Sequence, residues 1–185
     1  HYADFSNWQV NWLKSDELQL QLDYWRDRLH GAPSMLELPI DYPRGTVQTH
    51  VGNHISGELP PELIGKLKAL AIKNGSTLFM VLLAGFDVLL SRYSNQNDIL
   101  VGTPVAGRKR TELESLVGFF VNTLVLRADL SDNPRFTDLI KQVKQTALEA
   151  YDNQDLPFER LVDEVQPTRD MSRSPLFQVM FVLQN

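Results

Sequence analysis

Residues 115 to 130 read SLVGFFVNTLVLRADL and combine a turn, two aromatic residues and an apolar strand pattern. Apolar residues recur there at every second position, at Leu124, Leu126, Ala128 and Leu130. This is the period of a β-strand with a buried face, so we expect a strand over 122–130. Asn122 and Thr123 lie at its entry, behind Gly118. Such a polar pair can hydrogen-bond a ligand amide or carbonyl, or it can satisfy the backbone of its own turn.

Strands and helices are interspersed along the rest of the chain. Further strands are expected at 53–59, 98–106 and 176–183. Helices are expected at 3–30 (two helices), 60–74, 77–93, 134–151 and 157–165. This order predicts a layered α/β class. Residues 32–48 carry three prolines and are expected to form a connector, which suggests a division into 1–48 and 49–185.

Composition limits the possible partners. The chain has 185 residues, 43% of them hydrophobic, and a net charge of −5. It gives no electrostatic argument for nucleic-acid binding. The longest mostly apolar run, 76–93, contains Asp87 and suits a buried helix better than a membrane span. There is no cysteine and the first residues do not resemble a signal peptide, so a soluble cytoplasmic protein is the default expectation.

No complete catalytic constellation is visible in the residues alone. None of the four histidines has a nucleophile and a carboxylate nearby in the sequence. His50 and His54 have a spacing that suits a zinc helix, but their neighbours favour a strand, so no metal site is expected. A loop with several charged residues lies between the last predicted helix and strand, at Arg169, Asp170, Ser172 and Arg173. It is either a salt-bridged surface loop or part of a functional wall.

Four stretches occur in the order YADFSNWQ (2–9), VGFFVNTLVLR (117–127), NQDLPFE (153–159) and RDMSRSPL (169–176). Taken together and in this order, they resemble motifs of the condensation domain of non-ribosomal peptide synthetases. DILVGTPVAGR (98–108) and PLFQVMFVLQN (175–185) also match the usual wording of that family. Because the stretches cover nearly the whole chain, we expect the family's fold throughout.

The resemblance implies an incomplete, two-layer sheet-and-helix lobe of the chloramphenicol-acetyltransferase-like fold. Residues 1–48 would be the end of a first lobe with its connector, and 49–185 most of a second lobe. The family's His-His-x-x-x-Asp-Gly motif is absent from this sequence. It normally precedes the Tyr-x-Asp element, so we expect the chain to be an excerpt that contains no catalytic residue and is inactive alone.

The activity implied by the resemblance is amide formation between aminoacyl or peptidyl thioesters. The substrates would arrive on the 4′-phosphopantetheine arms of upstream and downstream peptidyl carrier proteins, with an adjacent adenylation domain and the first lobe as further partners. No bound cofactor is expected, and neither is nucleic acid or membrane. An epimerisation domain, a carrier-recruiting platform without activity and an alcohol-esterifying acyltransferase of the same class remain alternatives.

Roles for individual residues follow from the same resemblance. Substrate positioning in a cleft is assigned to Asn122, Thr123, Gly118 and Arg108. The structural loop motifs comprise Asp155, Pro157, Phe158, Glu159, Arg169, Asp170, Ser172 and Arg173. The expected packing residues are Tyr2, Asp4 and Trp8, and a core position is expected for Phe119, Phe120 and Phe158.

Overall fold

The computed structural model describes residues 1–48, 51–165 and 171–184. The helices are α1 (Tyr2–Trp12), α2 (Asp16–Leu29), α3 (Pro61–Lys73), α4 (Leu78–Ser94), α5 (Phe136–Asp152) and α6 (Phe158–Val165), with a short 3-10 helix η1 (Thr111–Leu113). The strands are β1 (Asp98–Val105) and β2 (Asn122–Asp129). The predicted mixture of helices and strands is therefore confirmed, with boundaries within about two residues for these elements.

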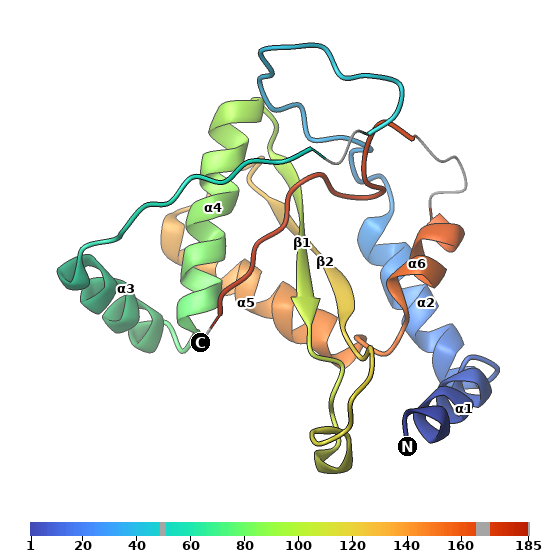
Figure 1. Cartoon of the computed structure of the whole chain (residues 1–185). Coiled ribbons are helices and arrows are strands. Elements are labelled where there is room, and N and C mark those ends of the chain that lie inside the picture. The colour runs from blue at the N-terminus through green and yellow to red at the C-terminus, as the bar shows by residue number, and fades with distance from the viewer. Residues whose placement is uncertain (49–50, 166–170, 185) are drawn as a thin grey trace.

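The two strands form an antiparallel pair that fixes the position of the candidate site. Their register runs from Asp98 opposite Asp129 to Val105 opposite Asn122. Residues 106–121 therefore leave the sheet and return to it at one end, and Asn122 lies at that end. Figure 1 shows this connection extending beyond the strands, beside α1.

The last predicted strand pairs with β1 over only a short stretch. Gly102 and Met180 form an isolated parallel bridge, and Val179 and Phe181 share hydrogen bonds with the Gly102 backbone at 3.0 and 2.9 Å. A side chain at residue 102 would collide with Phe177, since a Cβ there would lie 2.4 Å from its ring. Close contact of this kind requires glycine in the middle of β1.

The strand prediction for 53–59 is wrong. These residues form no regular secondary structure, and Ile55 is 99% exposed. Alternation stabilises a strand only when one face is buried and a neighbouring strand supplies hydrogen bonds. Residues 51–60 run along the outside of the molecule, where the structure gives them neither (Figure 1).

Helices cover the sheet and complete the core. α5 packs on β2 and α4 packs on both α5 and β1, while α2 and α6 pack together on the other side (Figure 1). Buried strand residues include Ile99, Val101, Leu124 and Val125. Because Leu124 and Val125 point to opposite faces, β2 is covered on both.

Within the part of the chain that the structure describes, no single helix is both long and apolar enough to cross a membrane. Only α3 and α4 taken together reach the required length and apolar composition, and the chain bends by 105° between these two helices.

Residues 1–48 share the core of the remaining chain. Leu22, Trp25 and Leu29 on α2 are buried in it, and the Trp25 indole donates a hydrogen bond to the Asn153 carbonyl at 3.0 Å. Arg127 on β2 donates to the carbonyls of Arg28 and His30 at the end of α2. The predicted division at residue 48 stays a prediction.

Candidate functional site

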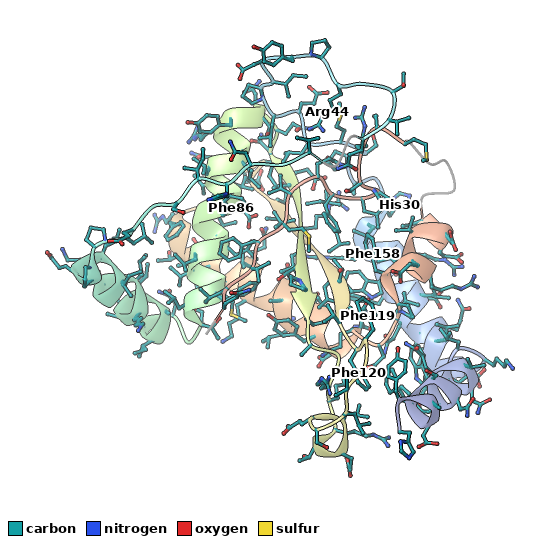
Figure 2. All side chains as sticks on the ribbon, viewed as in Figure 1. His30, Arg44, Phe86, Phe119, Phe120 and Phe158 are labelled. Carbon is teal, nitrogen blue, oxygen red and sulfur yellow. The ribbon has the colours of Figure 1, made fainter. Side chains whose placement is uncertain are left out.

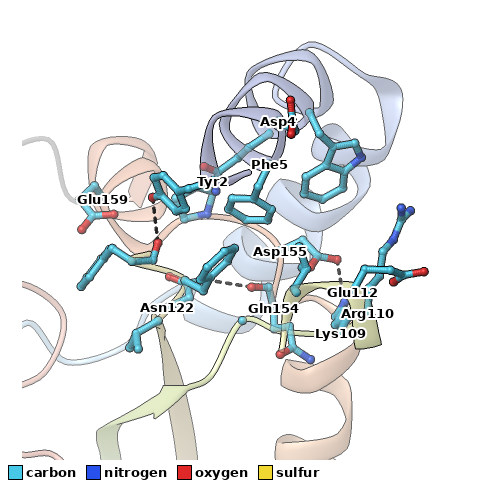
Figure 3. Close-up of a pocket in the computed structure, with 18 residues that line it drawn as sticks. Tyr2, Asp4, Phe5, Lys109, Arg110, Glu112, Asn122, Gln154, Asp155 and Glu159 are labelled. Atoms are coloured by element: carbon cyan, nitrogen blue, oxygen red, sulfur yellow. Dashed lines mark hydrogen bonds and ion pairs between the residues drawn. The ribbon is translucent and has the colours of Figure 1, made fainter. Parts of the chain in front are cut away.

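A pocket of about 660 Å³ opens at the end of the sheet (Figure 3). Its walls come from three segments distant in sequence: α1, the 107–122 connection and the 154–159 turn. Three of the four motif stretches singled out in the sequence therefore meet at one cavity. Its volume is in the range of small-molecule sites.

Asn122 holds two of these walls together. Its amide nitrogen donates to the carbonyls of Gln154 and Leu156, both at 2.8 Å. Its amide oxygen accepts from the backbone N–H of Thr123 at 2.9 Å and of Phe158 at 3.0 Å. Two donated and two accepted bonds use the whole capacity of an asparagine side chain. In this structure Asn122 therefore fixes the 154–158 turn, and the predicted contact with substrate stays a prediction.

Aromatic side chains join α1 to the 107–122 connection. The Tyr2 hydroxyl donates to the Phe119 carbonyl at 2.9 Å, and its ring meets Phe120 edge-on at 5.2 Å between centroids. Phe5, one turn along α1, lies 4.7 Å from the same Phe120 ring. Tyr2 and Phe5 thus connect α1 to residues 119 and 120, and the packing role expected of Tyr2 stays a prediction.

Gly118 contributes to this contact by having no side chain. A Cβ at residue 118 would lie 2.2 Å from the Tyr2 ring. Gly118 therefore lets Tyr2 approach the backbone, which is a different role from the ligand contact expected of it. Gly107 is similar: its φ is +65°, and a Cβ there would lie 1.8 Å from the Phe120 carbonyl oxygen.

The two phenylalanines of the VGFFVNT stretch differ. Phe120 is buried, as expected, whereas Phe119 is 75% exposed and lines the pocket, so its predicted core position is wrong. Consecutive residues of an extended segment point to opposite sides, and only one of them can face the core. Figure 2 labels both rings near the end of the sheet, below Phe158.

Arg108 supports the connection from outside the pocket lining. Its guanidinium donates to the carbonyl of Leu113 and lies over the Phe120 ring, 4.2 Å from the centroid. Among the described residues no carboxylate forms an ion pair with it, and its predicted role in substrate positioning stays a prediction. Arg108 shapes the turn at η1.

Charged side chains ring the pocket. Lys109 and Asp155 form an ion pair of 2.6 Å across it, between the connection and the turn (Figure 3). The Arg110 guanidinium lies 5.9 Å from the Trp8 ring centroid. Glu159, in the first turn of α6, also lines the cavity.

The remaining predicted residues are placed as follows. Thr123 pairs with Pro104 in the sheet, and Pro157 lines the pocket. The Phe158 ring packs 5.4 Å from Phe177. Asp4 lies in the first turn of α1, where the amino terminus pairs with it at 2.7 Å, and it also lines the pocket.

The described part of the RDMSRSPL stretch, residues 171–176, lies apart from the pocket lining. Arg173 donates to the Met35 sulfur and, at 3.4 Å, to the Ser172 hydroxyl. Arg169 and Asp170 lie outside the described residues.

Sequence reasoning missed several residues of the pocket. Phe5, Lys109, Arg110 and Gln154 line it but were not singled out. Phe5 follows Tyr2 by three positions at the start of a predicted helix, and extending that helix by one residue would have placed the two rings on one face. Nothing in the local sequence links Lys109 to Asp155. In the described residues, no group of three or more acidic or histidine side chains could hold a metal ion.

Comparisons with known proteins agree with the motif reading. The family model described as "Condensation domain" matches residues 1–185. Linear gramicidin synthase subunits C and D of Brevibacillus parabrevis are 58% and 55% identical to this chain over its whole length. The chain covers only 2% and 4% of these two relatives.

The fold agrees as well. A crystal structure of holo-AB3403, a four-domain nonribosomal peptide synthetase bound to AMP and glycine, is 34% identical with a TM-score of 0.88, over 91% of this chain and 13% of that one. The predicted α/β architecture of the chloramphenicol-acetyltransferase-like class is therefore confirmed.

Proposed function

Because the chain belongs to the condensation-domain family of nonribosomal peptide synthetases, we propose that it serves in amide-bond formation between two tethered aminoacyl substrates. One substrate is an aminoacyl or peptidyl thioester, and the other supplies the attacking amine. Attack forms a C–N bond, breaks the C–S bond and releases the thiol of the first carrier.

The meeting of three motif stretches at one pocket carries this proposal. Residues 2–9, 117–127 and 153–159 are far apart in the chain, yet each contributes to the same cavity. A cavity lined by aromatic rings and a few polar groups is the usual form of a small-molecule site. A purely structural motif has no need for a cavity of this size, which favours a substrate site over a recruiting platform.

The assigned residues act by positioning. The sequence has no His-His-x-x-x-Asp-Gly motif, so no proton transfer is assigned to it. Asn122 and the Lys109–Asp155 ion pair fix the 154–158 turn against the connection, and Tyr2 fixes α1. Holding two reactants in contact can supply a large part of the rate enhancement of a bimolecular reaction.

Partners follow from the relatives that contain this segment. Peptide synthetases such as the linear gramicidin synthase subunits suggest carrier-protein domains and an adenylation domain in the same assembly. The substrates would then be delivered on 4′-phosphopantetheine arms. The chain would bind them only during the reaction and would hold no cofactor of its own.

A segment exchange tests the activity. Residues 1–185 would replace the matching segment of a relative's complete condensation domain, and two carriers would be loaded with different amino acids. We expect dipeptide on the downstream carrier in a single turnover, detected by mass spectrometry. The unmodified domain is the positive control. A folded chimera that makes no dipeptide from the parent's own substrates would contradict the proposal, and a racemised aminoacyl group would indicate epimerisation.

A further inference from the structure

The turn at 154–159 is held by α2 as well as by Asn122. The side-chain oxygen of Gln21, on α2, accepts a hydrogen bond from the Leu156 backbone N–H at 3.0 Å. Four residues further along α2, the Trp25 indole donates to the Asn153 carbonyl at 3.0 Å. Residues four apart lie on one face of a helix, so a single face of α2 bonds the backbone of this segment at two points.

Leu156 is the residue at which α2 and β2 both meet the turn. Its N–H donates to Gln21, its carbonyl accepts from Asn122 at 2.8 Å, and its side chain is buried. Its two neighbours, Asp155 and Pro157, line the pocket. A residue fixed through both backbone groups and its side chain sets the position of the residues bonded to it. Gln21 therefore acts on a pocket wall although it is not part of the lining.

The same helix also carries the opposite wall of the pocket. α1 contributes to the lining and is joined to α2 by residues 13–15 alone. Across this corner the Trp12 indole donates to the Glu17 carboxylate at 3.0 Å. Figure 1 shows α1 leading into α2, and α2 lying beside α6. α2 therefore sets the separation between the α1 wall and the 154–159 wall, and Gln21 is one of its two bonds to the second wall.

We infer that Gln21 is a positioning residue for the proposed amide-forming reaction. Its side-chain oxygen fixes the 154–159 wall relative to the α1 wall, and it acts through the Leu156 backbone without touching a substrate. This rests on the proposed function, in which the pocket holds a reactant. Because alignment supplies much of the rate, a small displacement of one wall lowers the rate even when the residues of both walls are unchanged.

Three variants isolate the hydrogen bond from the packing. Gln21→Met keeps a side chain of similar length but offers no oxygen, so the Leu156 N–H loses its acceptor. Gln21→Glu keeps an acceptor oxygen and is the rescue variant. Gln19→Met is the matched control, because Gln19 is exposed on the same helix and bonds the Asp23 side chain there.

The chimeric condensation domain measures the effect on the reaction. Single-turnover dipeptide formation would be followed at increasing carrier concentration, at a temperature where circular dichroism shows every variant to be folded. We expect Gln21→Met to lower the maximal rate about tenfold and to leave the half-saturating carrier concentration unchanged. Gln21→Glu should recover most of the rate, and Gln19→Met should match the unmodified chimera.

A purely structural role predicts a different result. Val143→Ala shortens a buried side chain of α5 that is outside the pocket lining, and it lowers stability. If Gln21 contributed stability alone, Gln21→Met and Val143→Ala would both keep the full rate while folded. A full rate for Gln21→Met would therefore overturn the inference. An equal loss of rate for Val143→Ala would also overturn it, and so would a loss that Gln21→Glu does not recover.

Hydrogen exchange on the chain itself separates this inference from the proposed function. We expect Gln21→Met to speed exchange of the Leu156 N–H about tenfold and to leave exchange within β1 unchanged. Unchanged exchange at Leu156 would overturn the inference whatever the chimera does. Dipeptide formation at full rate by the Gln21→Met chimera would leave the proposed function standing and remove this inference alone. Faster exchange in a chain whose unmodified chimera makes no dipeptide would remove the proposed function and leave the fixing of the wall by Gln21 standing.

Discussion

At the scale of single residues, the pocket depends on two features. One is a side chain whose hydrogen-bonding groups are all occupied, and the other is a residue that has no side chain. Asn122 uses every hydrogen-bonding position of its amide on backbone groups, and Gly118 makes room for Tyr2. The sequence predicted that the polar pair Asn122 and Thr123 would hydrogen-bond either a ligand or the backbone of its own turn. It could not reveal three of the four partners of Asn122, which lie more than 30 residues away.

Asn122→Ala should destabilise the protein. It removes four hydrogen bonds and leaves the carbonyl of the buried Leu156 without its donor, so we expect a loss of about 2–4 kcal/mol in the free energy of unfolding. Urea unfolding measures it, and Asn53→Ala, at an exposed position, is the control. An unchanged unfolding midpoint would show that Asn122 is available to substrate rather than committed to the turn.

Gly118→Ala should displace Tyr2. The new methyl group would lie 2.2 Å from the Tyr2 ring in the present arrangement, and crowding of this kind costs about 1–3 kcal/mol. Gly85→Ala is the matched control: it lies exposed within α4 with open space around its Cβ position, and it should gain about 0.5–1 kcal/mol. The two effects have opposite signs, and thermal unfolding distinguishes them. Equal effects would contradict the contact between Tyr2 and residue 118.

At the scale of elements, the sequence patterns predicted strands correctly where neighbouring elements bury them. The sequence predicted strands at 98–106 and 122–130, and in the structure these two pair with each other. The strand predicted from alternation at 53–59 does not form. Residues 53–59 differ from the two strands because, within the described residues, they have neither a neighbouring strand nor a core to pack against, and the local sequence encodes neither.

α4 contains a buried carboxylic acid, Asp87, which interrupts an otherwise mostly apolar stretch of sequence. Asp87 is 2% exposed on the stripe of α4 that also buries Leu83, Ala84 and Leu90. Burial raises the pKa of this carboxyl to about 8, from an ordinary value of 3.8. The folded protein therefore keeps Asp87 protonated at a pH where the unfolded chain has released that proton.

The sign of the pH dependence follows. Because the folded pKa is raised, the contribution of Asp87 is fully present below about pH 4 and is lost as pH rises toward 8. Stability should fall by up to about 1.4 kcal/mol per pH unit from this group. Asp87→Asn should remove that part of the slope, as measured by urea unfolding at several pH values between 5 and 7.5. Parallel curves for the two proteins would contradict the raised pKa.

At the scale of the whole molecule, the site exists only because distant segments converge. α1 reaches the connection through Tyr2 and Phe5, and the connection reaches the 154–159 turn through Asn122 and Lys109. The motif resemblance predicted the family and fold, and the comparisons confirmed both. It did not predict that Phe119 would turn outward, because its exposure depends on how the segments pack.

The most direct test of the central claim is to locate a tethered substrate on the chain. The chimeric domain would be mixed with a downstream carrier whose arm holds a photoreactive, apolar aminoacyl group, and the cross-linked peptides would be identified by mass spectrometry. The account predicts cross-links within residues 2–9, 117–122 or 153–159. Cross-links confined to α3 or α4, in a domain that still forms dipeptide, would contradict the placement of the substrate in this pocket.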